Sequence, residues 1–224
     1  MRRTIAKRLG ESYRNAVHVT VSREVDAEAI LAAAEEADER FDADISLVDV
    51  LLVALSATLE GHPEFNATFE DGVHTIYEEH NLGVAVAVED GLLTPVIADA
   101  GELSLPELAA ERRRLTDLVQ TGEHAMSDLR NGTFTVSNLG PLGVDSFTQI
   151  INPPEVAILG VGRLRERARP AAGESEGESR DEITFRRELT FDLSVDHRVV
   201  DGADAARFLA TLAEHVTTAE EFVD

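Results

Sequence analysis

The chain has no cysteine, and this absence excludes several kinds of site. Without thiols the protein contains no disulfide, no thiolate metal site and no cysteine nucleophile. Lysine is almost absent as well, because Lys7 is the only one among 224 residues. Aspartate and glutamate number 43 against 20 lysines and arginines, so the formal net charge is −23. Nucleic acids and anionic membranes require a basic protein surface, and we therefore expect neither as a partner.

Long apolar segments are also missing. The most apolar run, residues 45–59, is too short to span a bilayer and contains Asp49. The opening residues MRRTIAKR carry charge, but no apolar segment follows them as in a signal peptide. We therefore expect a soluble, cytoplasmic protein. Its acidic, halophilic-type surface is typical of adaptation to high salt, where ions screen the repulsion between carboxylates. An ordinary acidic cytosolic protein is the alternative.

No linker rich in proline, glycine and serine divides the chain, so residues 1–224 are interpreted as one domain. Residues 1–14 form a basic N-terminal arm, with a short helix or arm expected over residues 2–13. Residues 170–182 (PAAGESEGESRDE) are acidic and low in complexity. Strand patterns adjoin this segment on both sides, so we expect a flexible hairpin loop there and not a domain linker.

Hydrophobic periodicity predicts both strands and helices along the chain. Asp26 and Ser46 are placed to cap the helices that follow them. The expected strands are residues 18–25, 65–69, 73–77, 82–88, 93–97, 133–137, 156–161 and 183–195, and the expected helices are residues 27–39, 47–59, 104–120 and 203–216. Since strands and helices do not alternate regularly, we predict a mixed β-sheet packed by helices.

The segment DHRVVDG at residues 196–202 lies between an alternating strand and an amphipathic helix. His197 and Asp201 are four positions apart, and histidine is the side chain whose ordinary pKa lies nearest neutrality. The pair is therefore a candidate acid–base centre. The spacing alone is weak evidence, because such a pair in a loop is more often structural.

Four segments together carry a resemblance to a known family. They are MRRTIAKRL (1–9) with HVT (18–20) and EVD (24–26); NLGVAVA (81–87) with GLLTPVI (91–97); GTFTVSNLG (132–140) with INPPEVAILGVG (151–162); and DHRVVDG (196–202). In this order they resemble the catalytic domain of the dihydrolipoamide acyltransferases, the core component of 2-oxo acid dehydrogenase complexes. The resemblance extends over essentially the whole chain.

The resemblance implies an α/β (α+β) two-layer sandwich with the fold of chloramphenicol acetyltransferase. It also implies a homotrimer with active sites between subunits, and in many members a higher cage of trimers. The substrates would be coenzyme A and lipoamide carried on a separate domain or protein. The partners would be a lipoyl-bearing protein and the 2-oxo acid dehydrogenase components.

Residue roles follow from the same resemblance. His197 would be the general base that removes the proton from the acceptor thiol, and Ser137 would donate a hydrogen bond to the oxyanion, with its counterpart in the family facing the histidine of a neighbouring subunit. Asp201, where the family has aspartate or asparagine, would orient the site. As alternatives, His197 is a buried strand-end histidine, Ser137 is an ordinary strand serine, and Asp201 caps the following helix.

Coenzyme A carries phosphates, which arginine binds in bidentate fashion. Two basic clusters are candidates, one containing Arg2 and Arg3 and one containing Arg163. Ion pairs with the abundant carboxylates are the alternative role for both. No histidine pair has metal-ligand spacing, so we expect no metal. Five further histidines carry no pattern that separates them from solvated surface residues: His62, His74, His80, His124 and His215.

The chain shows neither a lipoyl domain nor a subunit-binding domain, so it is either an excised core or a free-standing protein that meets its acyl carrier in trans. Three other functions stay open. They are a structural scaffold of a multienzyme complex, an acyltransferase with a different acceptor, and a serine hydrolase. The hydrolase is disfavoured because Ser137 lacks a Gly-x-Ser-x-Gly setting. The acyl group and the choice between trimer and cage cannot be read from the sequence.

Overall fold

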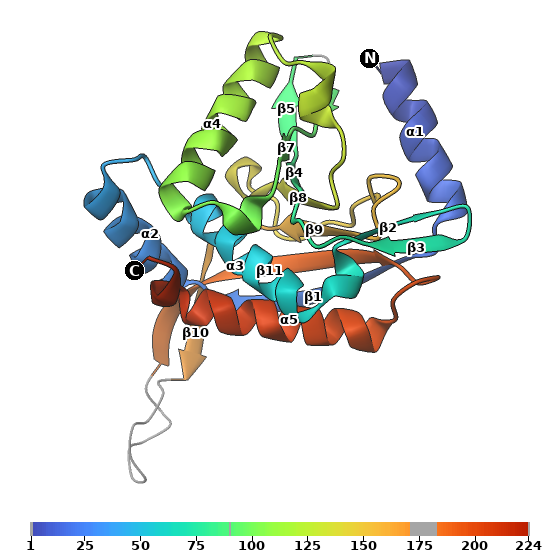
Figure 1. The fold of residues 1–224 in the computed structure, drawn as a ribbon. Coiled ribbons are helices and arrows are strands. Elements are labelled where there is room, and N and C mark those ends of the chain that lie inside the picture. Colours follow the sequence, from blue (N-terminus) through green and yellow to red (C-terminus); the bar gives the residue numbers. More distant parts are fainter. Residues whose placement is uncertain (1, 90, 171–182, 224) are drawn as a thin grey trace.

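A seven-stranded sheet runs through the computed structural model, which describes residues 2–89, 91–170 and 183–223 (Figure 1). The strand order is β1-β11-β9-β8-β4-β7, and β10 also pairs with β11. β8 runs parallel to both β4 and β9, whereas the other pairs are antiparallel, so the predicted mixed sheet is confirmed. Its strands are β1 (His18–Asp26), β4 (Leu82–Val84), β7 (Val96–Ile97), β8 (Phe134–Asn138), β9 (Ala157–Val161), β10 (Arg165–Pro170) and β11 (Ile183–Asp196).

Helices α2 (Glu28–Phe41), α3 (Leu47–Gly61), α4 (Leu105–Thr121) and α5 (Gly202–Thr217) contribute buried residues to the core on one face of this sheet. The structure also has helix α1 (Arg2–Asn15) and short 3₁₀ turns at Pro63–Phe65, Ala100–Glu102, Met126–Leu129, Gly140–Leu142 and Ala219–Phe222. α5 packs on β1 and β11, and α3 packs on α5. α1 stands apart at the edge of the molecule (Figure 1). None of the helices in the described ranges is long and apolar enough to cross a membrane.

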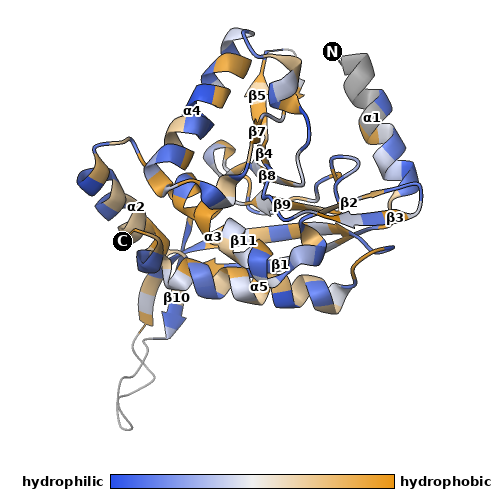
Figure 2. Ribbon diagram, in the orientation of Figure 1, coloured by the Kyte–Doolittle hydropathy of each residue, from blue (hydrophilic) through white to orange (hydrophobic). Residues whose placement is uncertain are grey.

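The core lies between the sheet and these helices. On β11, Leu189, Phe191, Leu193 and Val195 are buried on the helix side. The ring of Phe208 on α5 reaches across to β8, where its centroid lies 5.8 Å from that of Phe134. Figure 2 shows α3 as largely apolar, and the helix expected over residues 47–59 is observed there with most of its residues buried.

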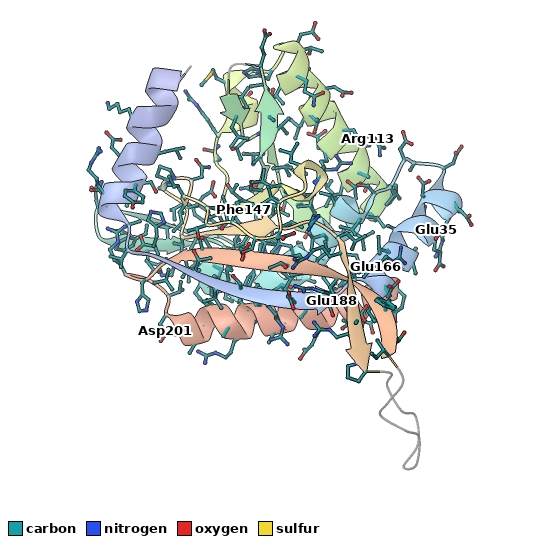
Figure 3. The ribbon with its side chains drawn as sticks, turned by 180° about the vertical axis from the view of Figure 1, so that it is seen from behind. Glu35, Arg113, Phe147, Glu166, Glu188 and Asp201 are labelled. Atoms are coloured by element: carbon teal, nitrogen blue, oxygen red, sulfur yellow. The ribbon has the colours of Figure 1, made fainter. Side chains whose placement is uncertain are left out.

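The opposite face of β11 is polar and yet buried. Asp192 and Ser194 are 1% and 0% exposed because the segment between β8 and β9 covers them. Within that segment, the Phe147 amide donates to Asp192 at 2.9 Å, and Ser194 donates to the Gln149 side chain at 2.8 Å. Figure 3 shows Phe147 over the sheet on the side away from α5.

Two predicted strands are divided in the structure. The expected strand 82–88 breaks at Ala85, whose amide donates to the Val136 carbonyl at 2.9 Å. Its second half becomes β5 (Val86–Val88), which pairs with β6 (Gly91–Leu93) in a separate two-stranded sheet. The expected strand 93–97 is interrupted before β7 at Pro95, which has no amide hydrogen to donate to a neighbouring strand. The chain therefore leaves the main sheet as a small separate hairpin.

Two pairs of strands that are neighbours in the sequence form hairpins. β2 (Ala67–Glu70) and β3 (Val73–Ile76), within the strands expected over residues 65–69 and 73–77, pair around a turn at Asp71 and Gly72. β10 and β11 pair antiparallel up to Pro170 and Ile183, while the predicted loop residues 171–182 lie outside the described residues. The predicted cap is wrong by one residue: α2 begins at Glu28 and its cap position is Ala27, while the Asp26 carboxylate accepts the Glu28 amide at 2.9 Å.

Candidate active site

His197 directly follows the last residue of β11. Its amide donates to the Val17 carbonyl at 2.8 Å, so its backbone is bonded to the residue that precedes β1. The amides of Val199 and Val200 donate to the Asp196 carbonyl, and the buried side chain of Val200 holds the loop that contains His197 against the core. The imidazole is exposed, and it makes no hydrogen bond to any described residue. Its ring nitrogens are therefore open to a group from outside the chain, so the buried alternative is wrong.

Asp201 ends the loop as the cap of α5. Its carboxylate accepts the amides of Ala203 at 2.7 Å and Asp204 at 2.9 Å. These amide hydrogen bonds, that of Asp204 first, hold the pKa of Asp201 below its ordinary value. Figure 3 shows Asp201 at the start of α5, at the far end of the sheet from Glu188. The capping role is thus observed, and the Asp201 carboxylate faces the helix N-terminus.

Ser137 lies near the end of β8 and is half-buried. Val136 before it is buried in the core, so the alternation of the strand turns the Ser137 side chain to the polar face of the sheet. After Ser137 the chain bends sharply, because the Asn138 side chain accepts the Gly140 amide at 2.9 Å and the Leu139 amide donates to Val161 at 3.1 Å.

The strand register separates Ser137 from His197 within one chain. Ser137 lies opposite Gly160 of β9, which in turn lies opposite Asp192 of β11. His197 is five residues beyond Asp192. Two strand spacings across the sheet and five residues along it amount to about 19 Å. Ser137, His197 and Asp201 therefore do not form a hydrolase triad within one chain.

The basic cluster before residue 170 is engaged in ion pairs. Arg163 pairs with Asp145, and Arg167 and Arg169 reach the Glu24 carboxylate on β1 at 2.5 and 3.3 Å. The ion-pair alternative thus describes these contacts. The other basic cluster contains Arg2 and Arg3, which lie in the first turn of α1. Their side chains are not among those that the structure describes.

Arg163 also borders an open pocket of about 470 Å³. The pocket lies where the parallel strands β8 and β9 end, beside the N-terminus of α3, and it is reached by the turn that follows Ser137. Ligands in sheets with parallel strands commonly bind outside such carboxyl ends. Its lining comprises Ser46, Leu47, Val48, Asn138, Gly140, Pro141, Gly143, Val161, Gly162, Arg163, Leu164 and Leu189.

One of the other histidines is not a surface residue, contrary to the prediction. His80 is only 7% exposed, and its Nδ1 lies 2.7 Å from the Ser56 hydroxyl. Burial lowers the pKa of His80, against the opposing charges of Glu60 and Asp99. No sequence periodicity marked this position, because it lies between β3 and β4. Among the described residues, no group of three or more histidines and carboxylates could hold a metal ion.

Sequence reasoning also missed the residues on either side of His197. Asp196 is 2% exposed, and its carboxylate is bonded to the Arg198 guanidinium. A signal was present, since polar residues occupy alternate positions of β11 from Glu188 to Asp196. On a strand, that pattern indicates a polar face, but not whether the face is buried.

Most of the chain matches a known protein family. The family model described as the catalytic domain of 2-oxoacid dehydrogenases acyltransferase matches residues 1–223. The dihydrolipoyllysine-residue acetyltransferase component of the pyruvate dehydrogenase complex from Rickettsia bellii is 34% identical over 220 residues, which cover 96% of this chain and 51% of that protein. The chain thus spans about half the length of this relative.

Solved structures agree in fold. A dihydrolipoamide acetyltransferase from Azotobacter vinelandii, studied for the catalytic role of a serine, a histidine and an asparagine four positions after that histidine, has a TM-score of 0.87 at 32% identity, covering 99% of this chain and 90% of that one. The cubic core of a pyruvate dehydrogenase multienzyme complex has a TM-score of 0.88 at 31% identity, covering 100% and 90%. Chloramphenicol acetyltransferase, at 16% identity and a TM-score of 0.60, covering 97% and 94%, shares the fold.

Proposed function

Since the chain belongs to the 2-oxoacid dehydrogenase acyltransferase family and spans its catalytic domain, we propose that it transfers an acyl group between coenzyme A and dihydrolipoamide. The observation that carries the proposal is the match over residues 1–223, which includes the exposed His197. The lipoyl group would be carried on a separate domain or protein that meets this site.

His197 acts as the general base in this proposal. A free thiol has a pKa of about 8.5 and is mostly protonated at neutral pH, so it needs a base to become a good nucleophile. The imidazole takes the thiol proton, and the thiolate attacks the thioester carbonyl. The tetrahedral intermediate then expels the other thiolate, which takes the proton back from the imidazolium. No acyl-enzyme forms.

Ser137 stabilises the intermediate in this proposal. Its hydroxyl donates a hydrogen bond to the oxyanion, and removal of one such donor commonly costs about 3–4 kcal/mol of transition-state stabilisation. Asp201 supports the site by holding the His197 loop to α5.

The active site lies between subunits in this proposal. Ser137 and His197 are about 19 Å apart along the sheet of one chain, which is too far for both to contact one carbonyl group. A homotrimer brings the His197 of one subunit to the Ser137 of the next. The similar cubic core supports an oligomeric assembly, and a higher cage of trimers is the larger form of it.

Coenzyme A enters, in this proposal, from the side of the Arg163 pocket. Arg163 would contact a phosphate after exchanging its Asp145 partner, and Arg2 and Arg3 are the other proposed phosphate contacts. The exposed position of the Arg163–Asp145 pair favours such an exchange, because exposed ion pairs contribute only about 0–1 kcal/mol.

Thioester exchange tests the function directly. The chain is assayed in low and high salt with acetyl-, isobutyryl- and succinyl-coenzyme A and dihydrolipoamide. We expect one donor to react, H197A to lose about 10²–10⁴-fold in kcat, and S137A to lose about 10²–10³-fold. The H124A variant, in the turn that follows α4, serves as the matched control and keeps wild-type activity. Undiminished transfer by H197A would contradict the mechanism, and a monomer in light scattering would contradict the shared site.

A further inference from the structure

The Asp196 carboxylate joins the segments that meet at His197. It is 2% exposed and accepts the amides of Val17 at 3.2 Å and Arg198 at 3.1 Å. It also accepts the Arg198 guanidinium, with Nε at 2.9 Å from Oδ1 and Nη2 at 2.5 Å from Oδ2. The residues bonded to this carboxylate are therefore the one after His197 and the one whose carbonyl accepts the His197 amide.

Arg198 extends these contacts to a third segment. Its guanidinium lies 4.7 Å from the centroid of the Phe69 ring on β2, in a cation–π contact. The Phe69 amide donates to the Pro154 carbonyl at 2.8 Å, so β2 is itself tied to the turn before β9. A guanidinium between a carboxylate and an aromatic ring has little freedom to move. Both flanks of His197 are thus bonded to elements far away in the sequence.

The charge state of this pair is settled by its surroundings. Burial acts most strongly and would raise the pKa of Asp196, but the hydrogen bonds from Arg198 and Val17 together hold that pKa below its ordinary value. Asp196 is therefore ionised at neutral pH, and Arg198 compensates its charge. An amide in place of the carboxylate accepts at one oxygen only and faces the remaining donors with its own N–H groups.

We propose that the Asp196–Arg198 pair is the positioning device of His197, which fixes the loop backbone so that the imidazole is presented outward to the partner subunit. This inference rests on the proposed acyl transfer. Neither side chain contacts the reacting atoms in this proposal; both act through the backbone of the base. Displacement of a catalytic group by about 1 Å commonly costs about 10²-fold in rate, which sets the size of the effect.

The test compares D196N, R198M and the double variant D196N/R198M with the wild-type chain. We expect kcat to fall about 10- to 100-fold in each single variant while KM for coenzyme A stays within about twofold. The double variant should lose little more than the worse single variant, because the two residues act as one unit. R198K, which keeps the charge but not the bidentate geometry, should lie between wild type and R198M. The pH profile of kcat should change in D196N and R198M.

Glu28 provides the matched control. Its carboxylate likewise accepts an amide and a guanidinium, both from Arg187, with the amide at 2.9 Å and Nη2 at 2.5 Å. E28Q should lower the thermal midpoint and leave kcat and its pH profile unchanged. If D196N shows only that behaviour, a lower midpoint with unchanged kcat, the positioning role is overturned.

Amide exchange separates this inference from the proposed function. The amides of Val17 and Arg198 donate to the Asp196 carboxylate, so D196N should speed the exchange of these two amides relative to residues 189–195 of β11. Unchanged exchange would overturn the positioning role of the Asp196–Arg198 pair even if the enzyme is active. Faster exchange in a chain that transfers no acyl group would support the positioning role and would contradict acyl transfer as the reaction of this site.

Discussion

Asp201 is bonded to the helix that it precedes, and this contact decides what its substitution does. Its carboxylate accepts two amides at the start of α5, and the pKa of Asp201 is lowered by these bonds. We expect D201A to lower the thermal midpoint, whereas D201N keeps it at pH 7, because asparagine caps helices as well as aspartate does.

The pH dependence of Asp201 follows in sign from its lowered pKa. A carboxyl whose pKa is lower in the folded state than in the unfolded state stabilises the fold above the unfolded pKa, and this contribution is lost as pH falls through the folded pKa. Wild type and D201N should therefore differ only below the ordinary value of 3.8. Thermal melts from pH 7 to pH 3 measure this, and equal midpoints for D201A and wild type at pH 7 would argue against the cap.

His80 makes stability fall in mild acid. Burial lowers the pKa of His80, so the folded state holds the neutral imidazole more strongly than the unfolded state does. Its contribution is complete above the ordinary pKa of 6.5 and decreases as pH falls from there toward the folded pKa. H80N, which keeps an atom to bond Ser56 but cannot titrate, should flatten the dependence of the urea midpoint between pH 7.5 and 5. S56A retains the titrating ring and should keep the wild-type dependence; an unchanged slope in H80N would contradict the prediction.

Among the elements, β9 contains Gly160, whose missing side chain leaves room for Gln149 of the segment between β8 and β9. A Cβ on Gly160 would lie 1.7 Å from Gln149 Nε2 and 3.1 Å from the Phe147 ring. Gln149 cannot move aside without loss, because it bonds both the Phe147 carbonyl and Ser194. We expect G160A to lower the free energy of unfolding by about 1–3 kcal/mol, as overpacking does.

Gly160 lies opposite Ser137, so the same substitution should also lower kcat. The double variant G160A/Q149A should recover part of the stability, because the clashing side chain is gone. G61A is the control, since a Cβ there meets nothing within 4 Å. Urea unfolding measures all three variants, and a G160A chain as stable as G61A would refute the overpacking.

The whole molecule is strongly acidic, and this property acts on stability through repulsion. The formal net charge is −23, while exposed ion pairs of the kind formed by Arg167 and Glu24 contribute only about 0–1 kcal/mol each. Raising the salt from about 0.1 M to 1 M shortens the screening length from about 10 Å to 3 Å. The stability gained from weaker repulsion between carboxylates should exceed the stability lost from weaker ion pairs. We therefore propose that the fold is adapted to high salt.

Thermal melts in potassium chloride test this proposal. The midpoint should rise between 0.1 M and 2 M salt. A variant with glutamine at Glu35, Glu36 and Glu39, which are exposed on α2, should show a smaller rise. Glu35 lies on the outer face of α2 in Figure 3. A midpoint that falls with salt would show that ion pairs contribute more to stability than repulsion removes, and that the surface is not adapted to high salt.

Local sequence determined much of this protein. The turn at Asp71 and Gly72, the helices that begin near residues 28 and 47, and the long strand before His197 all follow from residues two to four positions apart. Such contacts are encoded by periodicity and by capping residues, because the interacting groups are neighbours in the chain. The same local pattern located His197 and Asp201 in one loop.

Tertiary structure alone decided how those parts work together. Val17 donates to Asp196 across 179 positions, and no periodicity relates two residues so far apart. The division of the strand at Ala85 and the burial of His80 likewise depend on which strands become neighbours. Ser137 and His197 are separated because β9 lies between β8 and β11. Strand order is set by packing of the whole chain, and that order keeps the two proposed catalytic residues apart within one chain.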